Sequence, residues 1–517
     1  MPYGGRNTHS TIYSDFYLLM RGAKKRHHGE KLIGQWEWKI PLTYSRRVRS
    51  LSVFGHWHAN QLYPAPDVLE AIRSSFTEEC LFPNLRLLTW HVMVQDVSLF
   101  SDIRLFLSPK VIRANLYVPA TEPIISLLPS LPIQFPELLQ LSITSNPDNS
   151  DETLDSLPLL SRAMSMITLK LFRIEKLSVG SLDHRALEHL SRLPNLKSLE
   201  LRSFPGLPYV HNLQSLSLDV ADPFCALNDL HIAGNTAMQF AIEFLNMVSA
   251  WRLQTFNVLA RDIMAQSTID QLYSTIAGRL SPSILHSVII HDFDDEEHLE
   301  GSLADYVVNG SVLAPLCCFA NLTMISLCPP AGFDIDDTTA WDLARAWPKL
   351  ELLMLSPSID FWRHRLPPIR MTLHGLRAFA EHCKHLKHLT IHVNTTEVPP
   401  LDDSTTRVSP DKCILKFFNV GASAISDPPA VAQFLCALFP YLLDVDTSVD
   451  DDGWDDELGW DELLVQEDDD PEGIALERSE RSRHAKWREV AKLIDSVESS
   501  NSVTCTLRFV NNITTYN

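Results

Sequence analysis

Residues 291–298 read HDFDDEEH and have the chemistry of a metal site. Carboxylate oxygens and imidazole nitrogens are ligands for divalent cations, and this stretch contains seven such side chains, of which His291, Asp292, Asp294, Asp295 and His298 are the candidate ligands. Their spacing matches no known metal-binding loop, and a solvated acidic loop before a helix explains the same residues. We therefore predict no metal site here.

A second stretch, residues 381–392, is rich in histidine. It reads EHCKHLKHLTIH and contains Cys383 and four histidines: His382, His385, His388 and His392. These side chains could bind zinc, but histidines on the surface at the entry to a strand explain the pattern more simply. The sequence also lacks G-x-S-x-G, G-x-x-x-x-G-K and G-x-G-x-x-G, which mark hydrolase and nucleotide sites. We predict a protein that is not an enzyme and has no cofactor.

The elements that hold these side chains follow one pattern, which is clearest in LPNLKSLELRS at residues 193–203. Leu196, Leu199 and Leu201 are spaced as L-x-x-L-x-L. The last two leucines lie two residues apart, so both point to the same face of a short strand. Pro194 ends the preceding helix without removing a ladder hydrogen bond. The pattern predicts a strand with one buried face.

This pattern recurs about every 28 residues between Val48 and Leu442, within the range of roughly 20–29 residues for leucine-rich repeats. The first apolar residues of the copies are Val48, Leu85, Val111, Leu138, Met166, Leu196, Leu213, Leu227, Leu253, Leu285, Leu322, Leu350, Leu386, Leu415 and Leu442. Segments with helical periodicity lie between many of them, at 66–76, 183–193, 236–248, 267–280, 338–347, 372–383 and 429–439. Alternating strands and helices predict an α/β leucine-rich-repeat solenoid, a horseshoe with a parallel sheet inside and helices outside.

Charge divides the chain further. The net charge is −20, but residues 444–472 contain fifteen Asp or Glu and no Lys or Arg, so the rest carries only about −5. This balance argues against a general nucleic-acid surface. We predict a mobile tail at 1–43, the solenoid at 44–443 and a disordered acidic segment at 444–474. Residues 475–517 should form a helix, with Trp487, Val490 and Ile494 on one stripe, and a short strand that together cap the solenoid.

The nine cysteines form no C-x-x-C pair, which favours free thiols in a reducing compartment. No apolar run is long enough for a signal peptide or a membrane span. We therefore expect a location in the cytoplasm, the nucleus or both.

The chain resembles the F-box proteins with degenerate leucine-rich repeats found in mushroom-forming fungi. The resemblance rests on YSRRVRSLSV at 44–53 and on FPNLRLLTW, LPNLKSLEL, WPKLELLML and CKHLKHLTI. It implies a substrate-recognition subunit of a ubiquitin ligase that contains Skp and a cullin. Residues 1–43 lack the Leu-Pro opening of an F-box, so either the F-box has been lost or it lies upstream of Met1. The alternative is a non-enzymatic scaffold or inhibitor without an F-box.

A solenoid of this kind binds proteins through the polar positions of its strands. In the copy at 193–203 these are Lys197, Ser198, Glu200 and Arg202, and later copies add Glu351 and His388. We predict that these residues contact a protein partner on the concave face. We expect neither nucleic acid nor membrane as a partner.

Overall fold

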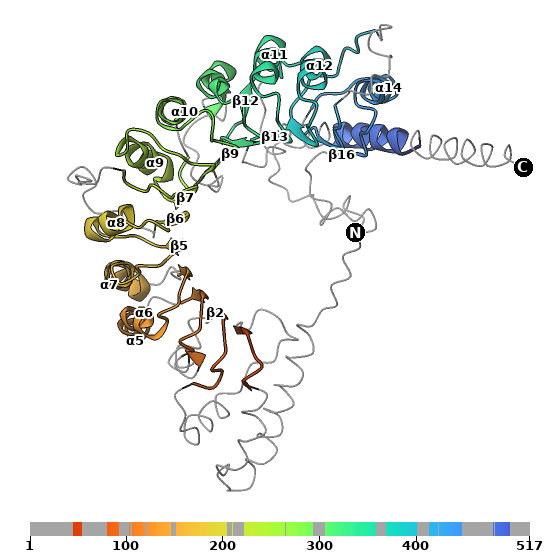
Figure 1. The fold of residues 1–517 in the computed structure, drawn as a ribbon. Helices are drawn as coiled ribbons and strands as arrows, with labels where there is room; N and C mark the ends of the chain where they lie inside the picture. Colours follow the sequence, from red (N-terminus) through yellow and green to blue (C-terminus); the bar gives the residue numbers. More distant parts are fainter. Residues whose placement is uncertain are drawn as a thin grey trace, which may run out of the picture. The chain divides into compact units, whose positions relative to one another are not determined.

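The computed structural model has a mixed α/β fold with a large parallel sheet of many strands (Figure 1). It describes residues 45–53, 80–91, 103, 106–118, 121–145, 151–203, 209, 222–263, 265–292, 306–357, 369–400, 413–421, 423–446, 479 and 481–496. The chain divides into two compact units, Met1–His231 and Ile232–Asn517. The division falls within strand β7 (Asp229–Gly234), and each unit is described separately.

The first unit alternates short strands with helices. Its strands are β1 (Ser50–Val53), β2 (Leu87–His91), β3 (Arg113–Tyr117), β4 (Gln140–Thr144), β5 (Lys176–Val179) and β6 (Ser198–Arg202). Its helices are α5 (Glu122–Leu127), the 3₁₀ helix η4 (Leu128–Ser130), α6 (Leu131–Gln134), α7 (Asp151–Thr168) and α8 (His184–Ser191). Neighbours in the sheet are neighbours in the sequence, and every pair is parallel.

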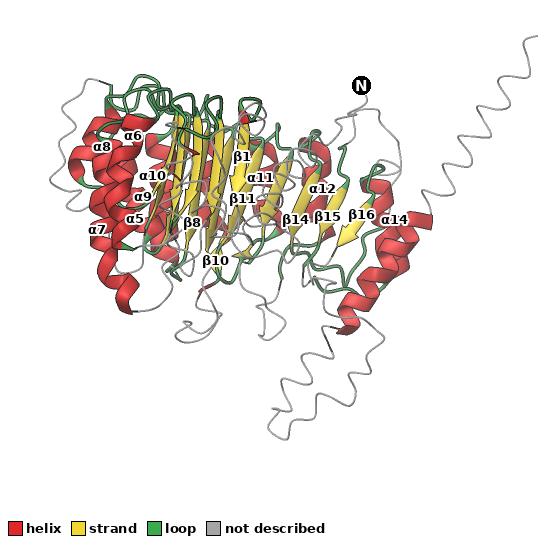
Figure 2. Ribbon diagram, turned by 90° about the horizontal axis from the view of Figure 1, so that it is seen from below, coloured by secondary structure: helices red, strands yellow, loops and turns green. Residues whose placement is uncertain are grey.

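The second unit repeats this arrangement. Its strands are β8 (Thr255–Ala260), β9 (Ser287–Asp292), β11 (Met324–Cys328), β13 (Leu352–Leu355), β14 (His388–Ile391), β15 (Phe417–Asn419) and β16 (Asp444–Asp446), with a separate small pair β10 (Val308–Asn309) and β12 (Phe333–Asp334). Its helices are α9 (Ala237–Asn246), α10 (Gln266–Arg279), the 3₁₀ helix η8 (Gly310–Cys318), α11 (Asp337–Ala346), α12 (Leu373–His382) and α14 (Pro428–Leu438). Figure 2 shows its strands side by side.

The strand register places one apolar side chain directly beside the next. In the second unit this row is Phe256, Val288, Ile325, Leu353, Leu389, Phe418 and Val445. All of these side chains are buried, because they point toward the layer of helices that lies on one face of the sheet in each unit (Figure 1). We call the opposite face of the sheet the open face. Parallel strands that share one buried row give a core that extends with every added strand.

A four-residue turn enters many of the strands. A buried residue accepts, at its carbonyl, a hydrogen bond from the N–H three residues later, and proline often follows it, as in Phe82-Pro83 and Trp347-Pro348. Proline favours the second position of such a turn. The buried first residues are Ser45, Phe82, Ser108, Phe135, Phe224, Phe319, Trp347, Cys383 and Phe439. Sequence analysis found the proline but missed the buried residue before it.

One backbone contact recurs at nearly every strand. The carbonyl of the residue before a strand accepts two N–H groups from the start of the next strand, as Lys197 does from Asn228 and Asp229. The same contact occurs at Arg49, Arg86, Ile112, Leu139, Glu175 and Lys197 in the first unit and at Gln254, His286, Thr323, Glu351, Lys387 and Lys416 in the second. All twelve occupy the first x of their L-x-x-L-x-L copy or its equivalent. The contact aligns each strand with its neighbour at one fixed position.

One predicted copy was wrong. Met166 and Leu169 were expected in a strand, but Met166 belongs to helix α7 and both side chains are exposed, by 43% and 36%. The strand lies eight residues later, as β5, with Ile174, Leu177 and Val179 buried. The helix at 151–168 contains leucine and methionine at spacings that resemble L-x-x-L-x-L. Pairing with the neighbouring strand β4 shows that the strand is β5.

The predicted copy at Leu213 lies outside the described residues, as do the predicted helix at 66–76, the predicted tail at 1–43 and the predicted strand at 503–510. The residue before β6 is hydrogen-bonded directly to the start of β7.

The other predicted helices are present with bounds shifted by a few residues. Asp183 is the N-cap residue of α8, and its carboxylate accepts the N–H of Ala186 at 2.8 Å. Satisfying an otherwise unpaired N–H at a helix start typically stabilises a protein by about 1 kcal/mol. Helices α5, α6 and α7 and the 3₁₀ helices η4 and η8 were not predicted from the sequence.

The C-terminal part of the second unit differs in detail from the prediction. The first three residues of the acidic segment, Asp444–Asp446, form strand β16, and residues 447–478 lie outside the described part. A helix covers 481–496. Its residues Trp487, Val490 and Ile494 are buried, as the predicted stripe requires.

Candidate protein-binding surface

The open face of the sheet is formed by the side chains that alternate with the buried rows. In β6 the exposure pattern alternates strictly, with Leu199 and Leu201 buried and Ser198, Glu200 and Arg202 partly exposed. This follows from the two-residue period of a strand. Most strands with the L-x-L spacing present their x residues to solvent in this way within each unit, whereas Ser178 of β5 and Ser326 of β11 are buried.

Three of the predicted contact residues lie on the open face of β6, and Lys197 directly precedes that strand. Glu200 accepts a hydrogen bond from the Arg202 side chain at 2.6 Å, and its carboxylate lies 3.6 Å from His231 Nδ1. Lys197 Nζ lies 2.9 Å from the carboxylate of Glu175 on the strand before. The charged side chains of Lys197, Glu200 and Arg202 are therefore already paired with one another or with neighbours.

His231 is half-buried beside this group. Burial lowers the pKa of its imidazole, the Glu200 carboxylate opposes that shift, and Arg202 adds to it. At neutral pH the imidazole is therefore uncharged, which weakens its attraction to Glu200.

Glu351 and His388 lie in the second unit and are brought together by the register of β13 and β14. Lys387 Nζ lies 2.5 Å from the Glu351 carboxylate. That hydrogen bond and the lysine charge lower the pKa of Glu351. His388 stacks on Phe417 of β15, with ring centroids 4.7 Å apart and planes 12° apart. The side chains of Glu351 and His388 are exposed.

The open face also has an apolar part that was not predicted from the sequence. Several x positions on strands β9 to β15 carry apolar side chains, and these positions lie beside one another on neighbouring strands. Met324 and Phe417 are 36% and 42% exposed, and Leu352, Met354 and Ile289 are partly exposed. We call Ile289, Met324, Leu352, Met354, His388 and Phe417 the apolar stripe. The signal was present in ELLML and KFFNV, where apolar residues fill polar positions.

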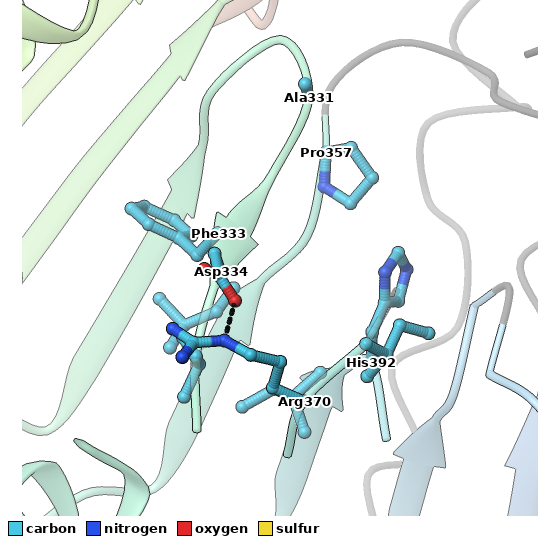
Figure 3. A pocket seen from close by; sticks show the side chains of 10 residues that line it. Ala331, Phe333, Asp334, Pro357, Arg370 and His392 are labelled. Atoms are coloured by element: carbon cyan, nitrogen blue, oxygen red, sulfur yellow. Dashed lines mark hydrogen bonds and ion pairs between the residues drawn. The ribbon is translucent and has the colours of Figure 1, made fainter. Parts of the chain in front are cut away.

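A small pocket lies beside β12, β13 and β14 (Figure 3). Arg370 Nε and Asp334 Oδ1 form an ion pair of 2.6 Å at its wall, and His392 faces it from another side. Its volume is about 30 Å³. That space takes only a few water molecules, whereas pockets for small-molecule ligands usually enclose about 300–1,000 Å³.

The candidate metal ligands that the structure describes do not lie together. Of the stretch 291–298, only His291 and Asp292 are described, and His291 Nε2 contacts Ser326 Oγ at 2.7 Å. His382 packs edge-on against Trp341, while His388 stacks on Phe417. Among the described residues there is no group of three or more His, Cys, Asp or Glu side chains arranged to hold a metal ion.

The described cysteines are free thiols. Cys328, Cys383 and Cys413 are buried, whereas Cys225 and Cys318 are exposed. Burial raises the pKa of the Cys383 and Cys413 thiols to about 12. Those two thiols are therefore protonated and unreactive at neutral pH.

Within the described residues, no helix has the length and apolar character needed to span a membrane. Comparison of the chain with protein-family models and with curated proteins gives no match.

Proposed function

We propose that this chain is a leucine-rich-repeat solenoid that binds another protein through the open face of its sheet. Support for the repeat comes from the backbone contact before each strand, the buried row of the register and the entry turn. These recur at the same positions of the sequence pattern. One unit of structure repeated along the chain accounts for all three, because each strand repeats the same contacts with its neighbour.

The apolar stripe carries the protein-binding part of this proposal. Met and aromatic side chains are enriched at protein interfaces. Here they lie on consecutive strands of an open face, with Met324 and Phe417 more than one third exposed. Scattered apolar residues on a surface are normal, but a row of them held in register on one face is typical of a contact surface. The adjacent pair Glu351 and Lys387 supplies a polar border.

Affinity capture with the full chain tests this proposal. We expect Met324→Glu together with Phe417→Glu to abolish capture of the protein partner, because each change places a charge in a desolvated contact. Ile133→Glu together with Leu159→Glu is the matched control. Those residues are 73% and 49% exposed on α6 and α7, away from the open face. Loss of capture in both double variants, or in neither, would contradict the proposal.

We further propose that the partner is a substrate presented to a ubiquitin ligase, with this chain as an F-box-type receptor in the cytoplasm or nucleus. The support is the resemblance carried by residues 44–53 and the strand copies. The segment where an F-box would precede the repeats, 1–43, lies outside the described residues. Stable co-purification with an Skp adaptor and a cullin is the expected result. Partner binding without either protein would favour the alternative, a scaffold or inhibitor.

A further inference from the structure

The strand starts of the first unit carry a row of cations. Arg49 and Arg86 directly precede β1 and β2, Lys110 lies in the turn before β3, and Arg113 and Lys176 begin β3 and β5. Arg113 and Lys176 share one register row with Gln140 between them. Neighbouring strands lie about 4.8 Å apart, so the five side chains follow one edge of the sheet. We call these five residues the basic rim.

Carboxylates do not neutralise the basic rim within the described part of the chain. Lys110 Nζ donates to Asn84 Oδ1 at 2.8 Å, and Arg113 Nε donates to Gln140 Oε1 at 2.5 Å. Arg49 donates to the carbonyls of Arg46 and Asn84. All five residues are exposed.

Cations elsewhere on the sheet are treated differently. Lys197 is paired with Glu175, and Lys387 is paired with Glu351. The described carboxylate nearest to Lys176 in the sequence is Glu175, which already pairs with Lys197. In a chain whose net charge is −20, a row of exposed cations with no carboxylate partner among the described residues is an exception.

Apolar side chains lie between these cations. Leu87, Ile112 and Leu139 are partly exposed at the starts of β2, β3 and β4. Cationic and apolar groups are therefore interspersed along the edge, together with Gln140 and Glu175. A ligand that fits this edge needs carboxylates to pair with the cations and apolar groups to contact Leu87, Ile112 and Leu139. An acidic peptide with interleaved apolar residues has this composition.

Nucleic acid fits the same edge less well. Single strands are held by aromatic side chains that stack on successive bases as well as by cations, and Leu87, Ile112 and Leu139 supply no stacking face. The strong negative net charge also repels a long polyanion. A short acidic segment experiences less of that repulsion.

We propose that the basic rim binds an acidic segment of a partner protein that carries interleaved leucine or aromatic residues. Carboxylates of the segment pair with Arg49, Arg86, Lys110, Arg113 and Lys176, and its apolar side chains contact Leu87, Ile112 and Leu139. This inference rests on the proposed function in one respect, that the partner is a protein. It names the chemistry by which that partner is recognised.

Fluorescence anisotropy with the full chain tests it. The probe is a labelled short peptide of alternating glutamate and leucine with one tryptophan, compared with an all-glutamate peptide, a lysine–leucine peptide and a single-stranded oligonucleotide. We expect the glutamate–leucine peptide to bind most tightly and to weaken as salt is added, because exposed charges are screened.

Two double variants locate the binding. Arg86→Glu with Arg113→Glu should lower the affinity for the glutamate–leucine peptide by at least about tenfold, since each change replaces an attraction with a repulsion. Arg162→Glu with Arg185→Glu makes the same charge change on the exposed surface of α7 and α8 and should leave affinity unchanged. Circular dichroism melting of both variants establishes that they fold.

Several outcomes would overturn the inference. These are no binding of the acidic peptide, equal affinity of the two double variants, or tighter binding of the oligonucleotide that is lost in the rim variant. Binding of the peptide only after the acidic residues at 450–470 are changed to Asn and Gln would assign the rim to the chain's own segment, against a partner. None of these outcomes changes the expected loss of protein capture in the variant that combines Met324→Glu with Phe417→Glu. The proposal for the basic rim can therefore fail while the proposal for the open face stands.

Discussion

The indole N–H of Trp487 donates a hydrogen bond to the carbonyl oxygen of Ser423 at 2.9 Å. The two residues are 64 positions apart, and the bond joins the helix at 481–496 to the loop after β15. Ser423 Oγ in turn accepts the N–H of Val393 at 2.8 Å, beyond β14. Lys486 adds a contact to the carbonyl of Ile425 at 3.3 Å. The C-terminal helix is therefore held to the last strands by specific bonds as well as by apolar contact.

Replacing Trp487 with alanine should destabilise the second unit by about 3–5 kcal/mol, the usual cost of deleting a large buried aromatic side chain. Trp487 is 1% exposed, and its loss also leaves the Ser423 carbonyl without its indole partner. Thermal unfolding followed by circular dichroism measures the effect. Glu489→Ala, on the exposed side of the same helix, is the control and should change the melting temperature little. A Trp487→Ala variant as stable as that control would show that the helix does not stabilise the unit.

Acid should weaken the same region through His392. Burial and the nearby Arg483 charge lower the pKa of this imidazole from 6.5 to about 4, and its ring packs against Gly421, whose φ is +50°. Above pH 6.5 the histidine is neutral in both the folded and the unfolded chain. Between pH 6.5 and 4 the unfolded chain binds the proton more readily, so stability falls as pH falls. The largest possible contribution is about 3 kcal/mol.

Melting temperatures measured from pH 7 to pH 4 test this contribution. His392→Gln cannot take up a proton and should lose part of the acid sensitivity, while its stability at pH 7 reflects packing alone. His91, His231 and His291 also have lowered pKa values because of burial. Some acid sensitivity should therefore remain in the variant. If the melting temperature falls equally with pH in the variant and in the parent chain, the assignment to His392 is wrong.

The sequence predicted the parallel sheet well because each strand carries its own signal. In the copy at 193–203 the spacing of Leu196, Leu199 and Leu201 alone determines which face is buried. The copy at Met166 failed because a helix with a three- and four-residue period contains the same spacing, and only pairing with β4 selects Leu177 as the strand residue. Local patterns identify elements, but the register between elements chooses among competing matches.

The candidate surface was less predictable than the fold. Lys197, Glu200 and Arg202 could be placed at or before one strand from the sequence, but the contacts of Lys197 with Glu175 and of Glu200 with His231 join residues of different copies. The apolar stripe was missed for a related reason. An apolar residue at an x position reads as core in a single strand, and only the stacking of His388 on Phe417 across two strands shows it as a surface.

Asp337 should be a major source of stability in the second unit. Its carboxylate accepts the backbone N–H and the hydroxyl of Thr372, each at 2.7 Å, and the N–H of Gly375 at 3.1 Å. It therefore satisfies donors at the start of α12 from the neighbouring helix α11. Asp337→Ala leaves these donors without their acceptor and should cost roughly 2–3 kcal/mol.

Urea unfolding gives the comparison. Asp342→Ala is the control, because that side chain is 68% exposed on the same helix and lies 3.9 Å from Arg345. Ion pairs this exposed contribute at most about 1 kcal/mol. Asp337→Asn keeps one acceptor oxygen and should fall between the two. Equal losses for Asp337→Ala and Asp342→Ala would mean that the carboxylate does not stabilise the start of α12.

The pair Glu200 and Arg202 should shift the titration of His231 in opposite directions. The Glu200 carboxylate favours the imidazolium and raises its pKa, while Arg202 disfavours it, and burial lowers the pKa more than either charge does. Glu200→Gln should therefore lower the pKa of His231 further below 6.5, and Arg202→Gln should raise it toward 6.5. Histidine-selective isotope labelling and NMR titration measure both values. Because the predicted effects have opposite signs, a general loosening of β6 cannot produce them together. Shifts in the same direction would show that the three side chains do not form the arrangement seen on the open face.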